Sequence, residues 1–218
     1  MISSTANARV KNIAVLQKKG KERKNQGLFV IEGRKLFEEV LRDAPDAIHE
    51  VYVTEAYLEQ PGHKKLLEKV SYELVSDNVM KAMAETMEPQ GILATVRIPQ
   101  YDKRALFEKK EAVWIALEDL RDPGNLGTVL RTAEAAGVTG VLLSDSSVDM
   151  YNPKVVRSTM GAIFRVPHFY LSDFLGELDS MKQAGVMARA EKTDHEEYIK
   201  YSIIIPKSGK KKNVSRET

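Results

Sequence analysis

The stretch DPGNLGTVLRTAEAAG, residues 122–137, decides the fold class of this chain. Its apolar residues recur at helical spacing, at positions 126, 129, 130, 133 and 136. We expect Asn125 to cap this helix and Gly137 to end it. Gly124 and Gly127 let a ligand approach the backbone closely, and the first turn of the helix offers N–H groups to an anion. The stretch therefore predicts a loop and helix that lie beside a bound ligand.

Buried strands are predicted on both sides of this helix. Residues 113–117 form a strongly apolar run before it, and residues 140–143 form another after it. A strand–helix–strand pattern with continuously apolar strands implies a parallel sheet covered on both faces, and we expect Trp114 in its core. Such sheets bind ligands beyond the carboxyl ends of their strands. The loop 118–125 is therefore the first place to look for chemistry.

The first hundred residues also alternate between strands and helices. We predict strands at residues 28–31, 48–53, 72–75 and 91–98. Ser76 or Asp77 suits the cap of a short helix that runs to about Glu85. A polar stretch follows Pro99 and predicts a linker. The expectation is an α/β chain with a small domain at 1–100, a linker at 101–110, and a second, mostly parallel-sheet α/β domain at 111–218.

The composition limits the classes of site and compartment. The chain has no cysteine, which excludes disulfides, thiolate zinc sites and a cysteine nucleophile, and which fits a reducing cytoplasm. The four histidines are scattered, so we expect no metal site. No apolar run approaches the roughly 18 residues of a membrane span, and residues 1–12 lack a signal-peptide core. We expect a cytoplasmic protein that binds neither metal nor membrane.

Positive charge is concentrated near the start of the chain. The net charge is only +2, yet residues 1–35 contain nine Lys or Arg against two acids, most densely at 18–24. A basic segment on a nearly neutral chain indicates a local footprint for a polyanion, with nucleic acid as the partner. The alternative is a solvated basic face. A second basic block, residues 210–212, lies near the end.

A second polar helix is predicted from NPKVVRSTMGA, residues 152–162. Asn152 suits its cap, and Pro153 suits its first helical position. Three polar residues share one face of this helix: Lys154, Arg157 and Ser158. That face suits a phosphate, because Arg binds it through a planar fork and Lys as a point charge. The alternative is a surface helix with solvated cations.

Arg131 is the polar residue of the first helix that invites a functional interpretation. It lies off the apolar stripe, so it faces either a cleft or solvent. The alternative is an ion pair with Glu134, three residues further along the same helix. Composition and spacing leave both interpretations open.

The two helical stretches together resemble the SpoU (TrmH) family of RNA 2′-O-methyltransferases. The matching pattern is Asn125-x-Gly127-x-x-x-Arg131-Thr132-Ala133-x-x-x-Gly137, followed by Asn152-Pro153-Lys154-Val155-Val156-Arg157-x-Ser/Thr-x-Gly161-Ala162. The N-terminal part resembles the family's substrate-binding domain through Asn7-x-x-Val10-Lys11, the basic stretch to Arg23, and Gly27-x-Phe29-x-Ile31-Glu32-Gly33. The resemblance covers about residues 5–195.

The resemblance implies a fold and an activity. The second domain of the family threads its C-terminal part into a trefoil knot, an exception to the usual rule against knots. The implied activity is methyl transfer from S-adenosylmethionine to a ribose 2′-hydroxyl of RNA, and the two-domain plan implies ribosomal RNA by analogy. The resemblance also implies a homodimer with the site near the subunit interface.

Two residues carry the catalytic expectation. Arg131 matches the family's catalytic arginine. Because a guanidinium is almost never neutral, we expect Arg131 to hold the hydroxyl and a neighbouring phosphate while negative charge develops on oxygen. Asn125 is expected to fix the loop or contact the nucleotide. The residues predicted to bind RNA are Arg9, Lys11, Lys18, Lys19, Lys21, Arg23, Lys154, Arg157 and Ser158. The residues that bind the methyl donor are not predicted.

The end of the chain departs from the family pattern. The family carries a Gly-Asn-Glu-Gly strand end and a Ser-Leu-Asn-Val helix start, which together wrap the donor. Here residues 203–205 suit the strand, but a lysine-rich stretch at 207–212 replaces the glutamate loop, and no Ser-Leu-Asn-Val follows. We therefore expect an incomplete C-terminal end that lacks the threaded knot.

Two other functions compete with the enzyme. A non-catalytic RNA-binding relative or fragment is the alternative that the missing donor motifs favour. A nucleotide phosphate loop at Gly124–Gly127 is disfavoured, because the stretch has neither G-x-G-x-x-G nor the lysine of a P-loop.

Overall fold

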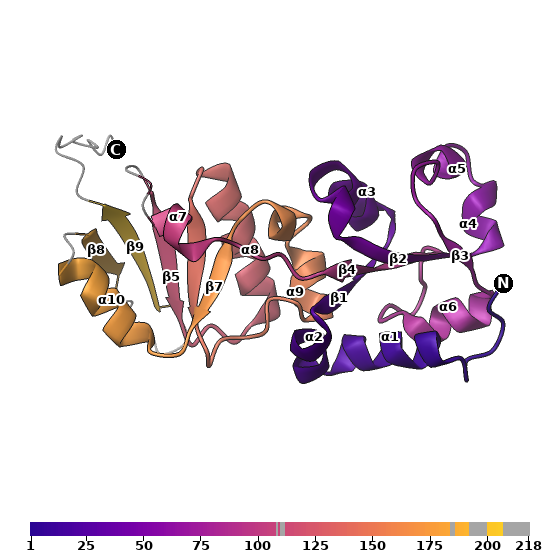
Figure 1. Ribbon diagram of the computed structural model, residues 1–218, viewed down its shortest axis with the longest axis horizontal. Coiled ribbons are helices and arrows are strands. Elements are labelled where there is room, and N and C mark those ends of the chain that lie inside the picture. The colour runs from indigo at the N-terminus through magenta and orange to yellow at the C-terminus, as the bar shows by residue number, and fades with distance from the viewer. Residues whose placement is uncertain (108, 110–111, 184–185, 192–199, 207–218) are drawn as a thin grey trace. The chain divides into compact units, whose positions relative to one another are not determined.

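The computed structural model of the chain describes residues 1–107, 109, 112–183, 186–191 and 200–206 (Figure 1). It divides into two compact units. The first unit contains residues 1–100, 122–132 and 148–165. The second contains residues 101–121, 133–147 and the described part of 166–218. Both stretches that carry the family pattern thus contribute to the unit formed by the first hundred residues.

The first unit begins with an α/β domain. Its elements are α1 (Ala8–Lys18), α2 (Gly20–Gln26), β1 (Leu28–Glu32), α3 (Arg34–Asp43), η1 (Pro45–Ala47), β2 (Ile48–Val53), α4 (Glu55–Glu59), α5 (His63–Leu66), β3 (Glu73–Leu74), α6 (Asp77–Met83) and β4 (Ile92–Arg97). The four predicted strands are confirmed, with β3 shorter than expected. Ser76 caps α6, because its side chain accepts a hydrogen bond from the Val79 N–H.

The strands form a four-stranded sheet in the order β1-β4-β2-β3. Strand β4 is antiparallel to both β1 and β2, and β2 is parallel to β3. Helices α1 and α6 pack on one face of this sheet (Figure 1), because their apolar residues meet those of the strands in one core. The largest buried residues of that core include Ile13, Leu16, Tyr52, Met80, Met83 and Leu93.

Helices α8 (Pro123–Ala135) and α9 (Pro153–Ser158) and the short η2 (Ala162–Phe164) follow the predicted linker. The first unit takes in α9, η2 and all but the end of α8. Aromatic contacts help to hold this part to the N-terminal sheet, since the Phe29 ring packs 4.9 Å from that of Tyr151 and 6.2 Å from that of Phe164.

The second unit is built on a five-stranded sheet in the order β7-β6-β5-β9-β8. Its elements are α7 (Lys103–Phe107), β5 (Trp114–Glu118), β6 (Gly140–Ser144), β7 (His168–Leu171), α10 (Phe174–Gln183), β8 (Val186–Glu191) and β9 (Lys200–Pro206). Strands β5, β6 and β7 are parallel, and the apolar runs predicted the first two of them. Strand β9, which includes the predicted strand 203–205, is antiparallel to both β5 and β8.

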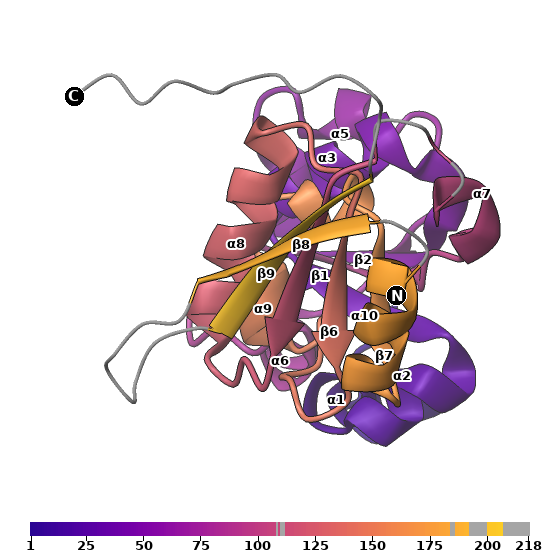
Figure 2. The ribbon, with the colours of Figure 1, turned by 90° about the vertical axis from the view of Figure 1, so that its left-hand side faces the viewer.

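Helix α10 lies across one face of this sheet (Figure 2). Its Phe174 and Leu178 pack with Trp114 and Leu142 of the strands. Trp114 is 2% exposed, so its predicted place in the core is confirmed. The ring of Phe107, from the short helix α7 in the predicted linker, stacks 4.4 Å from the Trp114 ring.

The lysine-rich stretch at 207–212 and the end of the chain lie outside the described residues, and so does the expectation that the knot is incomplete. No helix in the described part is long and apolar enough to cross a membrane. Among the described residues there is no group of three or more His, Asp or Glu that could hold a metal ion.

Candidate functional site

Helix α8 begins one turn earlier than the sequence predicts, and a different residue caps it. Asp122 accepts a hydrogen bond from the Asn125 N–H at 2.7 Å, and Pro123 is the first helical residue. The expected cap at Asn125 is therefore wrong. The physical reason is that proline suits the first helical position, where its missing N–H costs nothing, so the aspartate before it becomes the cap. Asn125 instead lies exposed in the first turn.

The other end of α8 is as predicted. Gly137 has φ +66°, and its N–H donates to the Glu134 carbonyl at 3.0 Å. The N–H of Val138 donates to the Ala133 carbonyl at 2.9 Å. These two bonds form a Schellman motif, which requires a left-handed residue that glycine supplies at least cost. The helix therefore ends at a fixed point before β6.

Helices α8 and α9 meet at Gly127. A Cβ atom built on Gly127 would lie 2.0 Å from the Ser158 Oγ and 2.5 Å from its Cβ, so only glycine fits. Ser158 donates through its hydroxyl to the carbonyls of Pro123, at 3.1 Å, and Val155, at 2.8 Å. The hydroxyl thus joins the two helices, and its predicted contact with RNA stays a prediction.

Arg131 lies on the same face of α8 as Gly127, because residues four apart on a helix lie one above the other. Its side chain is exposed. Within the described part of the chain it makes no hydrogen bond or ion pair, so the alternative pair with Glu134 does not form. The arginine that matches the family's catalytic residue is therefore accessible, one helical turn from the α8–α9 contact.

Helix α9 starts as predicted. The side chain of Asn152 accepts a hydrogen bond from the Lys154 N–H at 2.9 Å, and Pro153 is the first helical residue. Lys154 is exposed, whereas Val155 and Val156 are buried. The helix therefore anchors through its valines and presents Lys154 to solvent.

Arg157 points toward the N-terminal sheet rather than fully into solvent. It is half-buried, and it lines a cavity of about 10 Å³ together with Gln17 of α1 and Glu32 of β1. Gln17 is 6% exposed, and its Oε1 has no hydrogen-bond partner among the described residues. A cavity of this size with polar groups around it has room for about one water molecule. Sequence reasoning missed Gln17, because nothing in its spacing sets it apart from the core residues of α1.

Arg23 is a correction to the predicted RNA-binding set. It is 3% exposed, and its guanidinium donates to the Asp149 Oδ2 through Nε at 2.9 Å and Nη2 at 2.6 Å. Its Nη1 donates to the carbonyls of Leu16 and Gln17. Because all three of its nitrogens donate hydrogen bonds inside the protein, Arg23 has a structural role. It ties α2 to the loop before α9.

A second tie joins α3 to the residues after η2. The guanidinium of Arg165 pairs with Glu39 at 2.6 Å and also with Asp43. A hydrogen bond from Arg42 lowers the pKa of the Asp43 carboxyl from its ordinary value, and Arg165 lowers it further, although burial opposes both. The Arg23–Asp149 pair and the Arg165 cluster, here called the two ties, bind the two ends of the 148–165 stretch to the first hundred residues.

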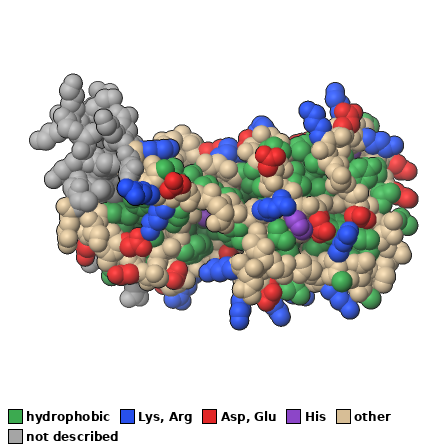
Figure 3. All heavy atoms as spheres, in the orientation of Figure 1, with side chains coloured by type: hydrophobic (Ala, Val, Ile, Leu, Met, Phe, Trp, Pro, Cys, Tyr) green, Lys and Arg blue, Asp and Glu red, His purple; other side chains and the backbone are tan. Residues whose placement is uncertain are grey.

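The remaining predicted cations of α1 and α2 are exposed. Arg9 pairs with Glu50 at 3.7 Å and Glu73 at 3.4 Å, which partly neutralises it. Four lysines project into solvent at or next to these helices: Lys11, Lys18, Lys19 and Lys21. On the face drawn in Figure 3, Lys and Arg side chains alternate with acidic ones rather than forming one continuous basic patch. Their contact with RNA stays a prediction.

At the carboxyl ends of β5 and β6, serine hydroxyls hold the loops of the second unit. The Ser144 Oγ accepts from the Asp119 N–H at 2.8 Å, and the Ser147 Oγ accepts from the Leu120 N–H at 3.2 Å. The two hydroxyls also lie 3.1 Å apart, within hydrogen-bond distance. These bonds hold Asp119 at φ +52°, a backbone conformation that non-glycine residues rarely adopt.

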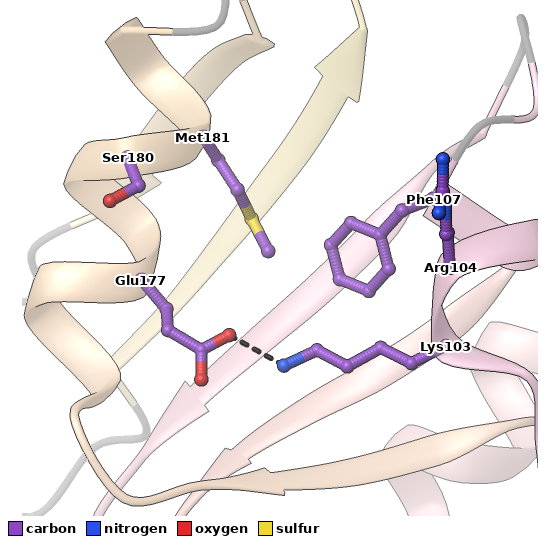
Figure 4. Close-up of a pocket in the computed structure, with 6 residues that line it drawn as sticks. All are labelled: Lys103, Arg104, Phe107, Glu177, Ser180 and Met181. Atoms are coloured by element: carbon purple, nitrogen blue, oxygen red, sulfur yellow. Dashed lines mark hydrogen bonds and ion pairs between the residues drawn. The ribbon is translucent and has the colours of Figure 1, made fainter.

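The second unit also contains an apolar cavity of about 500 Å³ between α7 and α10 (Figure 4). Phe107 and Met181 face it, and an ion pair of 2.6 Å between Lys103 and Glu177 crosses one side. None of the residues predicted to act in catalysis or RNA binding lines it. The predicted site residues all belong to the first unit.

Comparison with known proteins finds two family models, which match separate parts of the sequence. Residues 7–94 match the family of MRM3-like substrate binding domains. Residues 112–212 match the SpoU rRNA Methylase family. The second match covers both stretches that carry the pattern around Arg131 and Arg157.

Relatives match over most of the chain. The 23S rRNA (guanosine(2553)-2′-O)-methyltransferase RlmP of Bacillus subtilis is 34% identical over 185 residues, which is 85% of this chain and 70% of RlmP. A crystal structure of an RNA 2′-O ribose methyltransferase has 33% identity and a TM-score of 0.66, covering 84% of this chain and 69% of the other. An rRNA methyltransferase from Sinorhizobium meliloti, crystallised with S-adenosylmethionine bound, has 28% identity and a TM-score of 0.66, covering 82% and 68%.

The fold and the site thus define an α/β RNA methyltransferase with a separate substrate-binding domain. The chain belongs to the SpoU rRNA methylase family. The resemblance inferred from the motifs is confirmed.

Proposed function

We propose that this chain transfers a methyl group from S-adenosylmethionine to a ribose 2′-hydroxyl of ribosomal RNA, with Arg131 at the reacting oxygen. The observation that carries the role of Arg131 is its guanidinium, which is exposed and unpaired within the described part of the chain, one turn from the contact between α8 and α9. RlmP, a relative named as a 23S rRNA 2′-O-methyltransferase, favours this function over that of a non-catalytic RNA-binding relative.

The methyl donor supplies the electrophilic carbon. At the carboxyl edge of the sheet, the serine hydroxyls are bonded to backbone amides and to one another, so they hold the loops. The proposed roles belong to residues that would face the RNA.

Arg131 would donate hydrogen bonds to the 2′-oxygen while that oxygen gives up its proton to solvent water and gains negative charge. A fixed cation in a site that excludes water stabilises such a charge far more than it would in bulk water. The side chain of Asn125, which is exposed in the first turn of α8, would contact the same nucleotide. Lys154, exposed on α9, would bind a phosphate of the RNA backbone as a point charge.

Two finer features belong to this proposal. We infer a homodimer and a cytoplasmic location from the family resemblance and from the absence of cysteine. Size-exclusion chromatography with light scattering tests the first: a mass of about twice 24.5 kDa is expected, and a monomer at all concentrations would contradict it.

The test of the function is methyl transfer to 23S rRNA transcribed in vitro, with tritiated S-adenosylmethionine as donor. We expect label in the RNA, recovered as a 2′-O-methylated nucleoside. Calorimetric titration with S-adenosylmethionine alone should show saturable binding. A folded sample that binds the RNA but neither binds the donor nor transfers label would instead identify a non-catalytic RNA-binding protein.

A further inference from the structure

Met160 is an exposed apolar residue inside the second motif. It is 46% exposed, while its neighbours Thr159 and Gly161 are buried. Its backbone has φ +51°, and apart from Asp119 no other non-glycine residue in the described part of the chain has a positive φ. A left-handed residue with a large side chain is strained by roughly 1–2 kcal/mol. Glycine would relieve that strain, so the thioether is present at a cost in stability.

The position of Met160 relates it to Arg131. Ser158, two residues before it, contacts α8 at Gly127, and Arg131 lies one turn along that same face. Met160 follows the end of α9 directly, and its N–H donates to the Arg157 carbonyl at 3.3 Å. Met160 is thus an exposed residue two positions along the chain from the contact between the two motif helices, on the stretch that also carries Arg157 and Lys154.

We propose that the Met160 side chain packs against the base of the nucleotide whose ribose Arg131 contacts. This inference rests on the proposed function. When Arg131 holds the ribose, the base attached to that ribose lies within a few ångströms of it. The base offers a flat π face. Methionine packs favourably on such faces, since sulfur is polarisable and the side chain adapts its shape. The surrounding cations would hold the phosphates while Met160 covers the base.

Met160→Gly separates this contact from folding. Glycine adopts the left-handed conformation without strain, so the variant should melt at or above the wild-type temperature, by about 2–4 °C. Its affinity for 23S rRNA transcript should nevertheless fall about 3- to 10-fold. Its KM for the RNA should rise by a similar factor while kcat stays the same, because the contact holds ground state and transition state alike. Met160→Leu should keep most of the affinity.

The slope of log RNA affinity against log salt concentration shows whether a variant has displaced the neighbouring cations, because each lost contact between a cation and a phosphate lowers this slope. Met160 carries no charge, so Met160→Gly should leave that slope unchanged, whereas displacement of Lys154 or Arg157 would lower it. Met87→Gly is the matched control, since Met87 is 95% exposed on the substrate-binding domain. It should change neither affinity nor KM.

The outcomes are distinct. Unchanged RNA affinity and KM in Met160→Gly would overturn the proposal. Met160 would then only terminate α9 and would not contact RNA. A change in oligomeric mass without a change in RNA affinity would also overturn it, and would assign the side chain to a second copy of the chain. If the wild type binds RNA without transferring methyl, the proposed function fails, yet a weakened affinity of Met160→Gly would still support the base contact.

Discussion

Arg23 and Arg131 are the same residue type in two regions of the first unit, and they have opposite environments. Arg23 is buried, with its guanidinium bonded to Asp149 and to two carbonyls. Arg131 is exposed and has no partner within the described residues. A buried guanidinium must find partners, because its desolvation is costly, whereas an exposed one keeps its donors for a ligand. The partners of an arginine, rather than its place in a basic stretch, therefore indicate whether it supports the fold or binds RNA.

The largest expected effect is on the exposed member of this comparison. Arg131→Ala should lower kcat about 100- to 1000-fold, because it removes the donor at the oxygen that becomes negative. RNA affinity and melting temperature should barely change. Steady-state methyl transfer to 23S rRNA measures kcat, and filter binding measures RNA affinity. Thr128→Ala, an exposed change on the same helix, should be neutral, and an active Arg131→Ala would remove the catalytic role.

The buried member should show the reverse pattern. Arg23→Met removes the hydrogen bonds to the Asp149 Oδ2 and to two carbonyls, and should lower the free energy of unfolding by about 3 kcal/mol. Urea denaturation measures this loss, and a double-mutant cycle with Asp149→Asn isolates the pair. Lys18→Met, an exposed change nearby, should stay within about 0.5 kcal/mol. A stability loss no greater than that of Lys18→Met would show that Arg23 is not a tie.

The exposed lysines near Arg23 test whether exposure in this basic stretch goes together with RNA binding. Replacing Lys18, Lys19 and Lys21 together by Gln should weaken RNA binding roughly tenfold and reduce the salt slope by about one per lost phosphate contact. Arg23 is kept, because it is buried. Lys64, Lys65 and Lys69, replaced by Gln in the same way, are the charge-matched control. Equal salt slopes for the two triple variants would show that Lys18, Lys19 and Lys21 form a solvated basic face and do not contact RNA.

The smallest effect concerns the second tie and depends on pH. The folded-state pKa of Asp43 lies below its ordinary value, so its carboxylate stabilises the fold above about pH 4, and this contribution is lost as pH falls through the folded pKa. Asp43→Asn should therefore be less stable than wild type at neutral pH, and the gap should narrow on acidification. Urea midpoints between about pH 3 and 7 test this. A gap independent of pH would mean that the charge of Asp43 contributes nothing.

Local patterns predict much of the fold. Strands β1, β2, β4, β5 and β6 were predicted from apolar runs, and α9 from the Asn152-Pro153 start. The cap of α8 was missed, because Asp122-Pro123 and Asn125 both suit a helix start and only the backbone decides between them. Strand β7 was missed because it is only four residues long and begins with His168.

The site could be predicted in part. The family resemblance identifies the motif residues Arg131 and Arg157. It does not predict whether each side chain is exposed. The two ties each join side chains 126 residues apart, and no periodicity in the sequence relates such positions. Arg23 lies in the most basic stretch of the chain, so composition favoured an RNA contact that its burial excludes.

The contact between Gly127 and Ser158 has a consequence for how this sequence can vary. Any side chain at position 127 would collide with Ser158, and shrinking Ser158 to glycine would remove both hydrogen bonds that its hydroxyl makes. A side chain at position 127 therefore demands a change at Ser158, and loss of the Ser158 hydroxyl by itself already weakens the joint. Evolution of the two motifs is therefore coupled at this contact. A substitution in one motif alone would disturb the packing between the helices that carry Arg131 and Lys154.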